Sequence, residues 1–150
     1  MKKIKLDNLD KKIINLLLLN STLSYREISA HVKSSAATVM NRVKRLQREG
    51  VIKAYTLSID YEKVGYDIEA LIEVRISKGK LFRVEKEIAN HKNVFAVYDL
   101  TGDFDAVILA RFKNRRELDT FIKKIQTYEF IERTNTRIIL NTIKEKQIGV

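Results

Sequence analysis

The fold of the N-terminal third is decided by residues 24–50, which read SYREISAHVKSSAATVMNRVKRLQREG. Ser24 and Glu27 have the spacing of a capping box, so a short helix is predicted to begin directly after Ser24. After a tight turn, Ser35 is a favourable N-cap for a second helix, and Gly50 is suited to end that helix in the left-handed conformation. Two capped helices separated by so short a turn are typical of a helix-turn-helix.

The second of these helices has two chemically different faces when its residues are spaced at about 100°. One face is apolar and is expected to close a three-helix core; it comprises Ala36, Val39, Val43 and Leu46. The other face carries long hydrogen-bond donors and one hydroxyl; it comprises Thr38, Asn41, Arg42 and Arg45. A helix with such a polar, basic face fits the major groove of DNA.

The polar face is predicted to read base edges, because Arg pairs with guanine and Asn with adenine through two hydrogen bonds each. Residues at the start and flanks of the helix are predicted to contact phosphates: Ser35, Lys44 and Arg48, with Lys33 adding a charge from the turn. The alternative is an amphipathic helix whose basic face is only solvated. The two caps and the short turn favour DNA binding over that alternative.

A third helix is predicted upstream of this pair. Asp7 and Asp10 form a D-x-x-D start that is close to a capping box and places acids at the positive end of a helix. Apolar residues then follow at helical spacing: Leu9, Ile13, Leu16 and Leu17. Residues 1–51 are therefore interpreted as a helix-turn-helix domain.

Positive charge is concentrated in this part of the chain. The 150 residues carry a net charge of +10, and residues 1–55 hold 12 Lys and Arg against 4 Asp and Glu. Residues 56–150 hold 17 against 15. The asymmetry indicates double-stranded DNA or another anionic surface as the partner of the N-terminal domain, the alternative being a general solubility charge.

Several classes of function are disfavoured by what the sequence lacks. There is no cysteine, which fits a reducing compartment such as the cytoplasm. The apolar stretch 13–19 is short and contains Asn15, so no signal peptide or membrane span is expected. His31 and His91 are far apart, and no phosphate-binding loop or nucleophile motif is present, so we expect no metal site, no cofactor, no catalytic residues and no enzymatic activity.

After Gly50 the apolar residues alternate with a period of two. An extended strand is predicted over 51–59, within a linker of 52–62. Further strands are predicted over 68–76, 94–100, 106–112 and 137–143, with helices over 81–91 and 118–125. This β-α-β-β-α-β order predicts a ferredoxin-like domain over 63–150, and so an α+β fold. One sheet face would remain uncovered by helices, which favours a homodimer through the sheets.

The ordered set of motifs resembles the Lrp/AsnC, or feast/famine, transcriptional regulators over nearly the whole length. The matching segments are Leu6-Asp7, Asp10 to Ile14, Tyr25 to Ser29, Thr38-Val39, Arg42 to Leu46, Glu49 to Lys53, Gly65-Tyr66, Thr101 to Asp105 and Thr134 to Thr136. The resemblance implies a winged-type helix-turn-helix joined to a regulatory ligand-binding domain, in dimers that often assemble into octamers.

The resemblance also implies an effector, usually an amino acid or a related small molecule, bound between dimers near the Thr-Gly-Asp hairpin. Carried over residue by residue, the effector site comprises Thr101, Gly102, Asp103, Asp105, Thr134 and Thr136. The chemistry is suitable, since a glycine N–H can donate a hydrogen bond to a carboxylate and an aspartate can form an ion pair with an ammonium. The alternative is that Gly102 and the two acids only shape the turn.

The chain departs from the family pattern in three places. The turn of the helix-turn-helix holds Lys33-Ser34, Asp60 is followed by Tyr61, and Glu129-Phe130-Ile131 precedes the last predicted strand. The hypothesis is therefore a sequence-specific regulator that responds to an effector, with an effector-independent or architectural DNA-binding protein as the alternative. An RNA-binding or enzymatic ferredoxin-like protein is disfavoured because residues 106–111 offer aliphatic side chains in place of stacking aromatics.

Overall fold

In a computed structural model that describes residues 3–77 and 79–150, the chain divides into two units. The first holds residues 1–58 together with 144–150, and the second holds residues 59–143. Each unit has its own apolar core. The sequence placed residues 144–150 in the second domain, whereas their contacts lie with the first.

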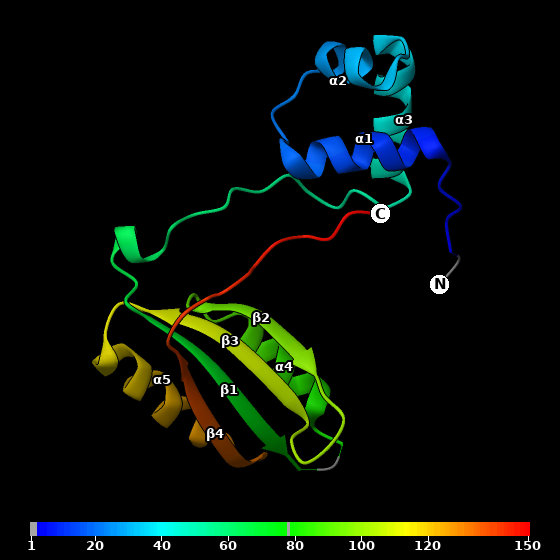
Figure 1. The fold of residues 1–150 in the computed structure, drawn as a ribbon. Coiled ribbons are helices and arrows are strands. Elements are labelled where there is room, and N and C mark those ends of the chain that lie inside the picture. Colours follow the sequence, from blue (N-terminus) through cyan, green and yellow to red (C-terminus); the bar gives the residue numbers. More distant parts are fainter. Residues whose placement is uncertain (1–2, 78) are drawn as a thin grey trace. The chain divides into compact units, whose positions relative to one another are not determined.

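Three helices build the first unit: α1 (Asn8–Leu19), α2 (Tyr25–Val32) and α3 (Ala36–Arg48) (Figure 1). The capping box at Ser24 and Glu27 is confirmed, and so is the cap at Ser35. The core residues of this unit are fully buried: Ile13, Ile28, Val39, Val43 and Leu46. Ala36, expected in this core, is exposed because it occupies the first position of α3, at the margin of the apolar stripe.

The turn between α2 and α3 is made by a residue with positive φ. Lys33 has φ 54° and ψ 52° and forms the C-cap of α2, with its N–H donating to the Ser29 carbonyl. Gly50, which follows α3, has φ 71°, as predicted for the residue that ends this helix. Both turns therefore use the left-handed conformation, but only Gly50 adopts it without the steric cost of a Cβ atom.

The second unit is an antiparallel sheet with two helices on one face. Its elements are η1 (Glu62–Val64), β1 (Ile68–Ile76), α4 (Leu81–Ala89), β2 (Val94–Asp99), β3 (Ala106–Phe112), α5 (Arg115–Gln126) and β4 (Ile131–Ile139). The strand order β2-β3-β1-β4 confirms the predicted β-α-β-β-α-β arrangement (Figure 1). Ile88 of α4 and Phe121 and Ile125 of α5 pack with the buried residues of β1 and β3. The side chains of Leu81 and Val84, predicted on the same apolar face of α4, lie outside the described set.

Two predicted strands differ from the structure. The last strand spans Ile131–Ile139 and not 137–143, because its antiparallel pairing with β1 already begins at Ile131, opposite Ile76. The centre of this strand is polar, because an edge strand tolerates polar side chains. In the sequence it therefore resembles a loop. Residues 53–60 form no strand, because an extended segment becomes one only when a neighbouring backbone takes up its hydrogen bonds.

The C-terminal segment of the chain is held against α1. The Asn15 side chain donates to the Val150 carbonyl at 3.1 Å and accepts from the Val150 N–H at 3.0 Å. A Cβ atom on Gly149 would lie 2.8 Å from Asn15 Oδ1, so the close approach depends on glycine. Among the helices of residues 3–77 and 79–150, none is long and apolar enough to cross a membrane.

Candidate nucleic-acid interface and ligand-binding hairpin

The exposed face of α3 is centred on residues that lie three and four positions apart along the helix. Asn41, Lys44 and Arg48 are all exposed and lie opposite the buried residues Val39 and Val43. Within the described chain, neither Lys44 nor Arg48 makes an ion pair. Both cations are therefore available for phosphate, and the Asn41 amide is available for a base edge.

The N-terminal end of α3 is organised by its cap. The Ser35 hydroxyl accepts from the Thr38 N–H at 3.0 Å and lies 2.8 Å from the Thr38 hydroxyl. Thr38 is half-buried, whereas Ser35 and Lys33 are exposed. This end of the helix combines the positive pole of its dipole with a nearby ammonium, which suits a phosphate.

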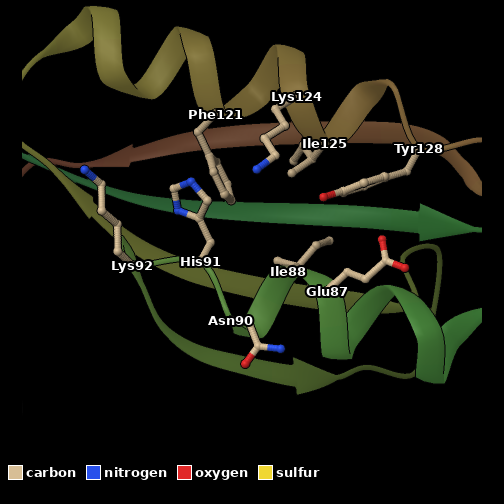
Figure 2. Close-up of a pocket in the computed structure, with 9 residues that line it drawn as sticks. All are labelled: Glu87, Ile88, Asn90, His91, Lys92, Phe121, Lys124, Ile125 and Tyr128. Carbon is tan, nitrogen blue, oxygen red and sulfur yellow. The ribbon is translucent and has the colours of Figure 1, made fainter.

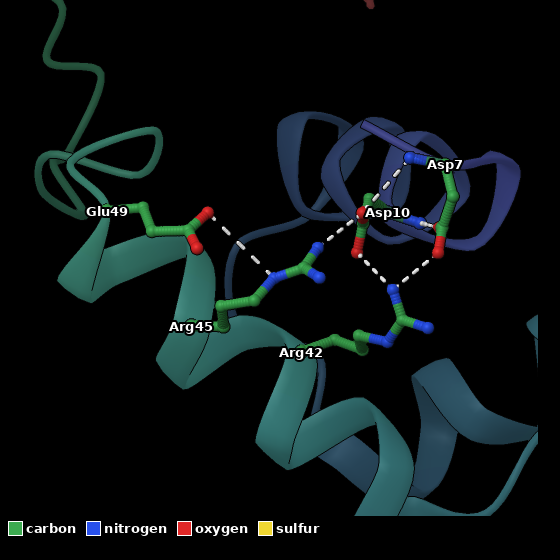
Figure 3. A network of polar contacts seen from close by, with 5 residues as sticks. All are labelled: Asp7, Asp10, Arg42, Arg45 and Glu49. Atoms are coloured by element: carbon green, nitrogen blue, oxygen red, sulfur yellow. Dashed lines mark hydrogen bonds and ion pairs between the residues drawn. The ribbon is translucent and has the colours of Figure 1, made fainter. Parts of the chain in front are cut away.

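Arg42 and Arg45 lie in a different environment from the one the sequence predicted. Arg42 Nη1 is 2.5 Å from Asp7 Oδ2 and 3.2 Å from Asp10 Oδ1, and Arg45 Nη2 is 2.5 Å from Asp10 Oδ2 (Figure 3). Arg45 Nε also lies 3.9 Å from Glu49 Oε2. Both guanidinium groups therefore contact acids at the start of α1 in this structure, whereas the sequence predicted them at base edges.

Each carboxylate of this network has several hydrogen-bond partners. Asp10 is 1% exposed, and its side chain accepts from the Asp7 N–H and from both arginines. The pKa of Asp7 is lowered, first by the hydrogen bond from the Asp10 N–H and then by Arg42. The pKa of Arg42 is raised, mainly by its hydrogen bond to Asp7. The network therefore favours the charged forms of Asp7 and Arg42 at the contact between α1 and α3.

The hairpin between β2 and β3 presents three of the predicted effector-binding residues to solvent. Thr101, Gly102 and Asp103 are exposed, and Gly102 has φ 119°, a conformation that favours glycine. Phe104 places its ring 5.8 Å from the Arg133 guanidinium of β4. The hairpin thus lies at the end of the sheet where β4 begins.

Asp105 has a structural role in this hairpin. Its Oδ2 accepts from the Ile76 N–H at 2.7 Å, and its backbone N–H donates to the Val74 carbonyl at 3.0 Å. Because these bonds hold the hairpin against the last residues of β1, the Asp105 carboxylate is partly occupied. The sequence predicted it as a ligand for the effector.

Thr134 and Thr136 point to the helix-covered side of the sheet. Thr134 pairs with Val74 and Thr136 with Ile72, and both of these partners are fully buried beneath the helices. The Thr134 hydroxyl lies 2.9 Å from Gln126 Nε2 of α5, which donates to it. The structure therefore brings Thr101, Gly102 and Asp103 into one loop, and it places the two threonines on β4, which β1 separates from β3, facing α5.

A pair of acids lies at the base of the hairpin. The pKa of Glu85 on α4 is raised to about 7, mainly by burial and then by its interaction with Asp99, the last residue of β2. Glu85 Oε1 is buried, and no donor reaches it from the described residues. Sequence reasoning missed this pair because no motif connects the two positions.

Both units of the chain match models of known protein families. Residues 6–53 match a model described as winged helix-turn-helix DNA-binding, and residues 69–148 match the Lrp/AsnC ligand binding domain. This chain belongs to the Lrp/AsnC family of transcriptional regulators. It is similar to an uncharacterised HTH-type transcriptional regulator of Pyrococcus abyssi, with 41% identity over 93% of this chain and 95% of that protein. It is also 37% identical to the HTH-type transcriptional regulator FL11 of Pyrococcus furiosus, over 93% of each chain.

Solved structures of the family share the whole architecture. E. coli AsnC has a TM-score of 0.89 and 25% identity, covering 97% of this chain and 99% of that chain. A transcriptional regulator from Neisseria meningitidis, solved in complex with L-Met, has a TM-score of 0.87 and 26% identity, covering 95% and 94%. Together with the family matches, these likenesses make this Lrp/AsnC protein a DNA-binding transcriptional regulator of α+β fold.

One signal in the sequence of this Lrp/AsnC regulator could have revealed the arginine network. Asp7 and Asp10 are three residues apart at the start of α1, and Arg42 and Arg45 are three residues apart on α3. Equal spacing places each pair on one helix face, so that two acids can meet two arginines. Charge pairing then competes with base reading for the same side chains.

Proposed function

We propose that α3 enters the major groove of DNA with Asn41 at the base edges and Lys44 and Arg48 at phosphates. The observation that carries this proposal is the position of these three side chains on the exposed face of α3, opposite its buried stripe. Lys33, Ser35 and Thr38 would add phosphate contacts at the start of the helix. Arg42 and Arg45 would act indirectly, by holding α3 against α1.

The test uses a DNA site selected from random sequences by the full-length protein. Asn41→Ala should lower the preference for that site over unrelated DNA by about 1–3 kcal/mol. Lys44→Gln should weaken binding to both DNAs and lower the slope of log K against log salt by about one unit. Lys86→Gln, which removes an exposed cation from α4, is the matched control. An unchanged salt slope in Lys44→Gln would contradict the proposed orientation of α3.

We propose further that the hairpin at Thr101, Gly102 and Asp103 receives the carboxylate and ammonium of an amino acid. The exposed glycine amide suits a carboxylate, and the Asp103 carboxylate suits an ammonium. Support comes from the ligand-binding description of the matched domain and from the L-Met complex of the Neisseria relative. Thr134 and Thr136 would contribute from β4, on the far side of β1.

A thermal-shift screen against the amino acids, followed by light scattering, tests the effector. An amino acid that binds the native state should raise the melting temperature by mass action, and Asp103→Ala should remove this rise. A matched control is Asp119→Ala, at an exposed acid on α5. If no amino acid raises the melting temperature, the regulator acts without such an effector, and an architectural role on DNA is favoured.

We also propose a homodimer through the sheet face that lies opposite α4 and α5, with octamers as the higher assembly. Leu71, Val107 and Leu109 lie on that face, because they alternate with the buried residues of β1 and β3. Leu109→Glu should convert dimers to monomers in light scattering. Equal mass of this variant and the wild type would contradict the proposed interface. A cytoplasmic location accords with a DNA partner.

A further inference from the structure

The helix-covered side of the second unit has a hollow that none of the proposed roles uses. It lies between α4 and α5 and has a volume of about 180 Å³ (Figure 2). Ile88, Phe121 and Ile125 line it with apolar surface, and each of them is at most 3% exposed. The apolar wall of the hollow is thus formed by residues of the domain core.

Positive charge surrounds the apolar wall of this hollow. Lys92 and Lys124 both line it and are exposed, and neither makes an ion pair within the described part of the chain. His91 lies beside them, and its pKa is lowered first by burial and then by the charges of Lys124 and Lys92. The two ammonium groups therefore create a positive potential at the imidazole.

The orientation of His91 leaves one ring nitrogen for a ligand. The Asn93 N–H lies 3.3 Å from His91 Nδ1 and donates to it, which assigns the proton of the neutral ring to Nε2. The ring is packed edge-on against Phe121, with the centroids 4.7 Å apart. A neutral His91 fixed in this way presents an N–H donor beside two ammonium groups.

A second hollow continues from the first. It has a volume of about 370 Å³ and shares Glu87 and Tyr128 with the first, while Phe130 extends its apolar wall. Tyr128 and Phe130 are stacked, with their centroids 5.5 Å apart. The two hollows together have the size of a small-molecule site, which typically spans roughly 300–1,000 Å³.

We propose that the groove between α4 and α5 binds a small organic carboxylate with an apolar body. The carboxylate would accept from Lys92, Lys124 and His91 Nε2, and the apolar body would lie against Ile88, Phe121 and Ile125. In an amino acid, the ammonium would face Glu87, whereas a carboxylic or 2-oxo acid has no ammonium to place there. This site is separate from the proposed effector hairpin and does not depend on it.

The experiment uses the two histidines of the chain as reporters in NMR titrations of the full-length protein. Phenylacetate, phenylpyruvate and L-phenylalanine are the probes, each added up to about 10 mM, which exceeds a millimolar Kd tenfold. A bound carboxylate should raise the pKa of His91, because it opposes the two lysine charges. His31 is exposed on α2 in the other unit and is the internal reference.

Substitutions separate this groove from other sites. Lys124→Gln should weaken the apparent Kd at least about tenfold, since a charge-assisted hydrogen bond is lost. Lys86→Gln, on the same pair of helices but outside the groove, should bind as the wild type does. Glu87→Gln should weaken the binding of L-phenylalanine and leave the binding of phenylacetate and phenylpyruvate unchanged. This result would identify amino acids, and not simple carboxylic acids, as the ligand class.

Three results would overturn the proposal. One is a His91 signal that no probe moves; another is a shift that survives both Lys124→Gln and Lys92→Gln. The third is a His91 response that disappears in Asp103→Ala, because the ligand would then occupy the hairpin. A failure of the thermal-shift screen at the hairpin leaves the His91 titration unaffected, so the two proposals can be judged apart.

Discussion

Arg45 Nη2 lies 2.5 Å from Asp10 Oδ2 and thereby joins the exposed helix α3 to the start of α1 (Figure 3). Asp10 is 1% exposed, whereas the Arg45 side chain is 32% exposed. The carboxylate is thus the buried end of the bridge and the guanidinium its solvent side. The contact of α3 with α1 therefore depends on a buried acid at the start of α1.

Asp10→Asn should destabilise the helix-turn-helix. The variant leaves Arg42 and Arg45 without their shared carboxylate. We expect the free energy of unfolding to fall by about 2 kcal/mol, because Asp10 is buried whereas both arginines are partly exposed. Amide hydrogen exchange in α1 and α3 measures the effect. Asp7→Asn is the comparison: Asn caps a helix as well as Asp does, and the ion pair that it removes from Arg42 is exposed, so a smaller loss is expected. Equal exchange rates in the two variants would show that Asp10 has no special role.

Lys33→Gly should stabilise the first unit while weakening DNA binding. Glycine accepts the φ of 54° without strain, so we expect a gain of about 1 kcal/mol in the free energy of unfolding. The loss of one ammonium should lower the salt slope of DNA binding by about one unit. Urea denaturation and salt titrations measure the two effects. Asparagine tolerates this conformation better than lysine does. The stability of Lys33→Asn should therefore lie between that of Lys33→Gly and that of the wild type.

Glu85→Gln should remove a pH dependence of stability. The folded-state pKa of Glu85 is about 7, against 4.5 for the free side chain, so the folded protein binds the proton more tightly than the unfolded chain does. Stability from this group is therefore present at low pH and is lost as the pH rises from 4.5 through 7. Thermal melts at about pH 5 and about pH 8 should show a smaller loss in Glu85→Gln than in the wild type. Asp99→Asn should act in the same direction, and a wild-type pH profile in both variants would contradict the coupling.

Asp105→Ala should destabilise the second unit, whereas Asp103→Ala should not. The first substitution deprives the Ile76 N–H of its acceptor at 2.7 Å, which we expect to cost about 1–3 kcal/mol. Asp103 is exposed and makes no such bond in the described residues. Urea denaturation of the two variants provides the comparison. A larger loss for Asp103→Ala would mean that the hairpin is held by different contacts.

Local features of this fold could be predicted because they depend on residues a few positions apart. The caps at Ser24 and Ser35 and the end of α3 at Gly50 follow from spacings of three or four residues and from glycine's access to positive φ. The alternation in β1 likewise indicated which of its side chains are buried. The range of β4 was misplaced because its polar centre hides its pairing with β1, which tertiary packing establishes.

The sequence by itself determined the order of helices and strands, the basic helix-turn-helix and membership of the Lrp/AsnC family. Only the tertiary structure decided which partners the long and polar side chains take. Arg42 and Arg45 bind acids 32 and 35 residues away, and Asp105 bonds Ile76 29 residues away. The physical reason is that periodicity assigns a face to a residue, whereas the charge or N–H group nearest to that face is set by how distant segments pack.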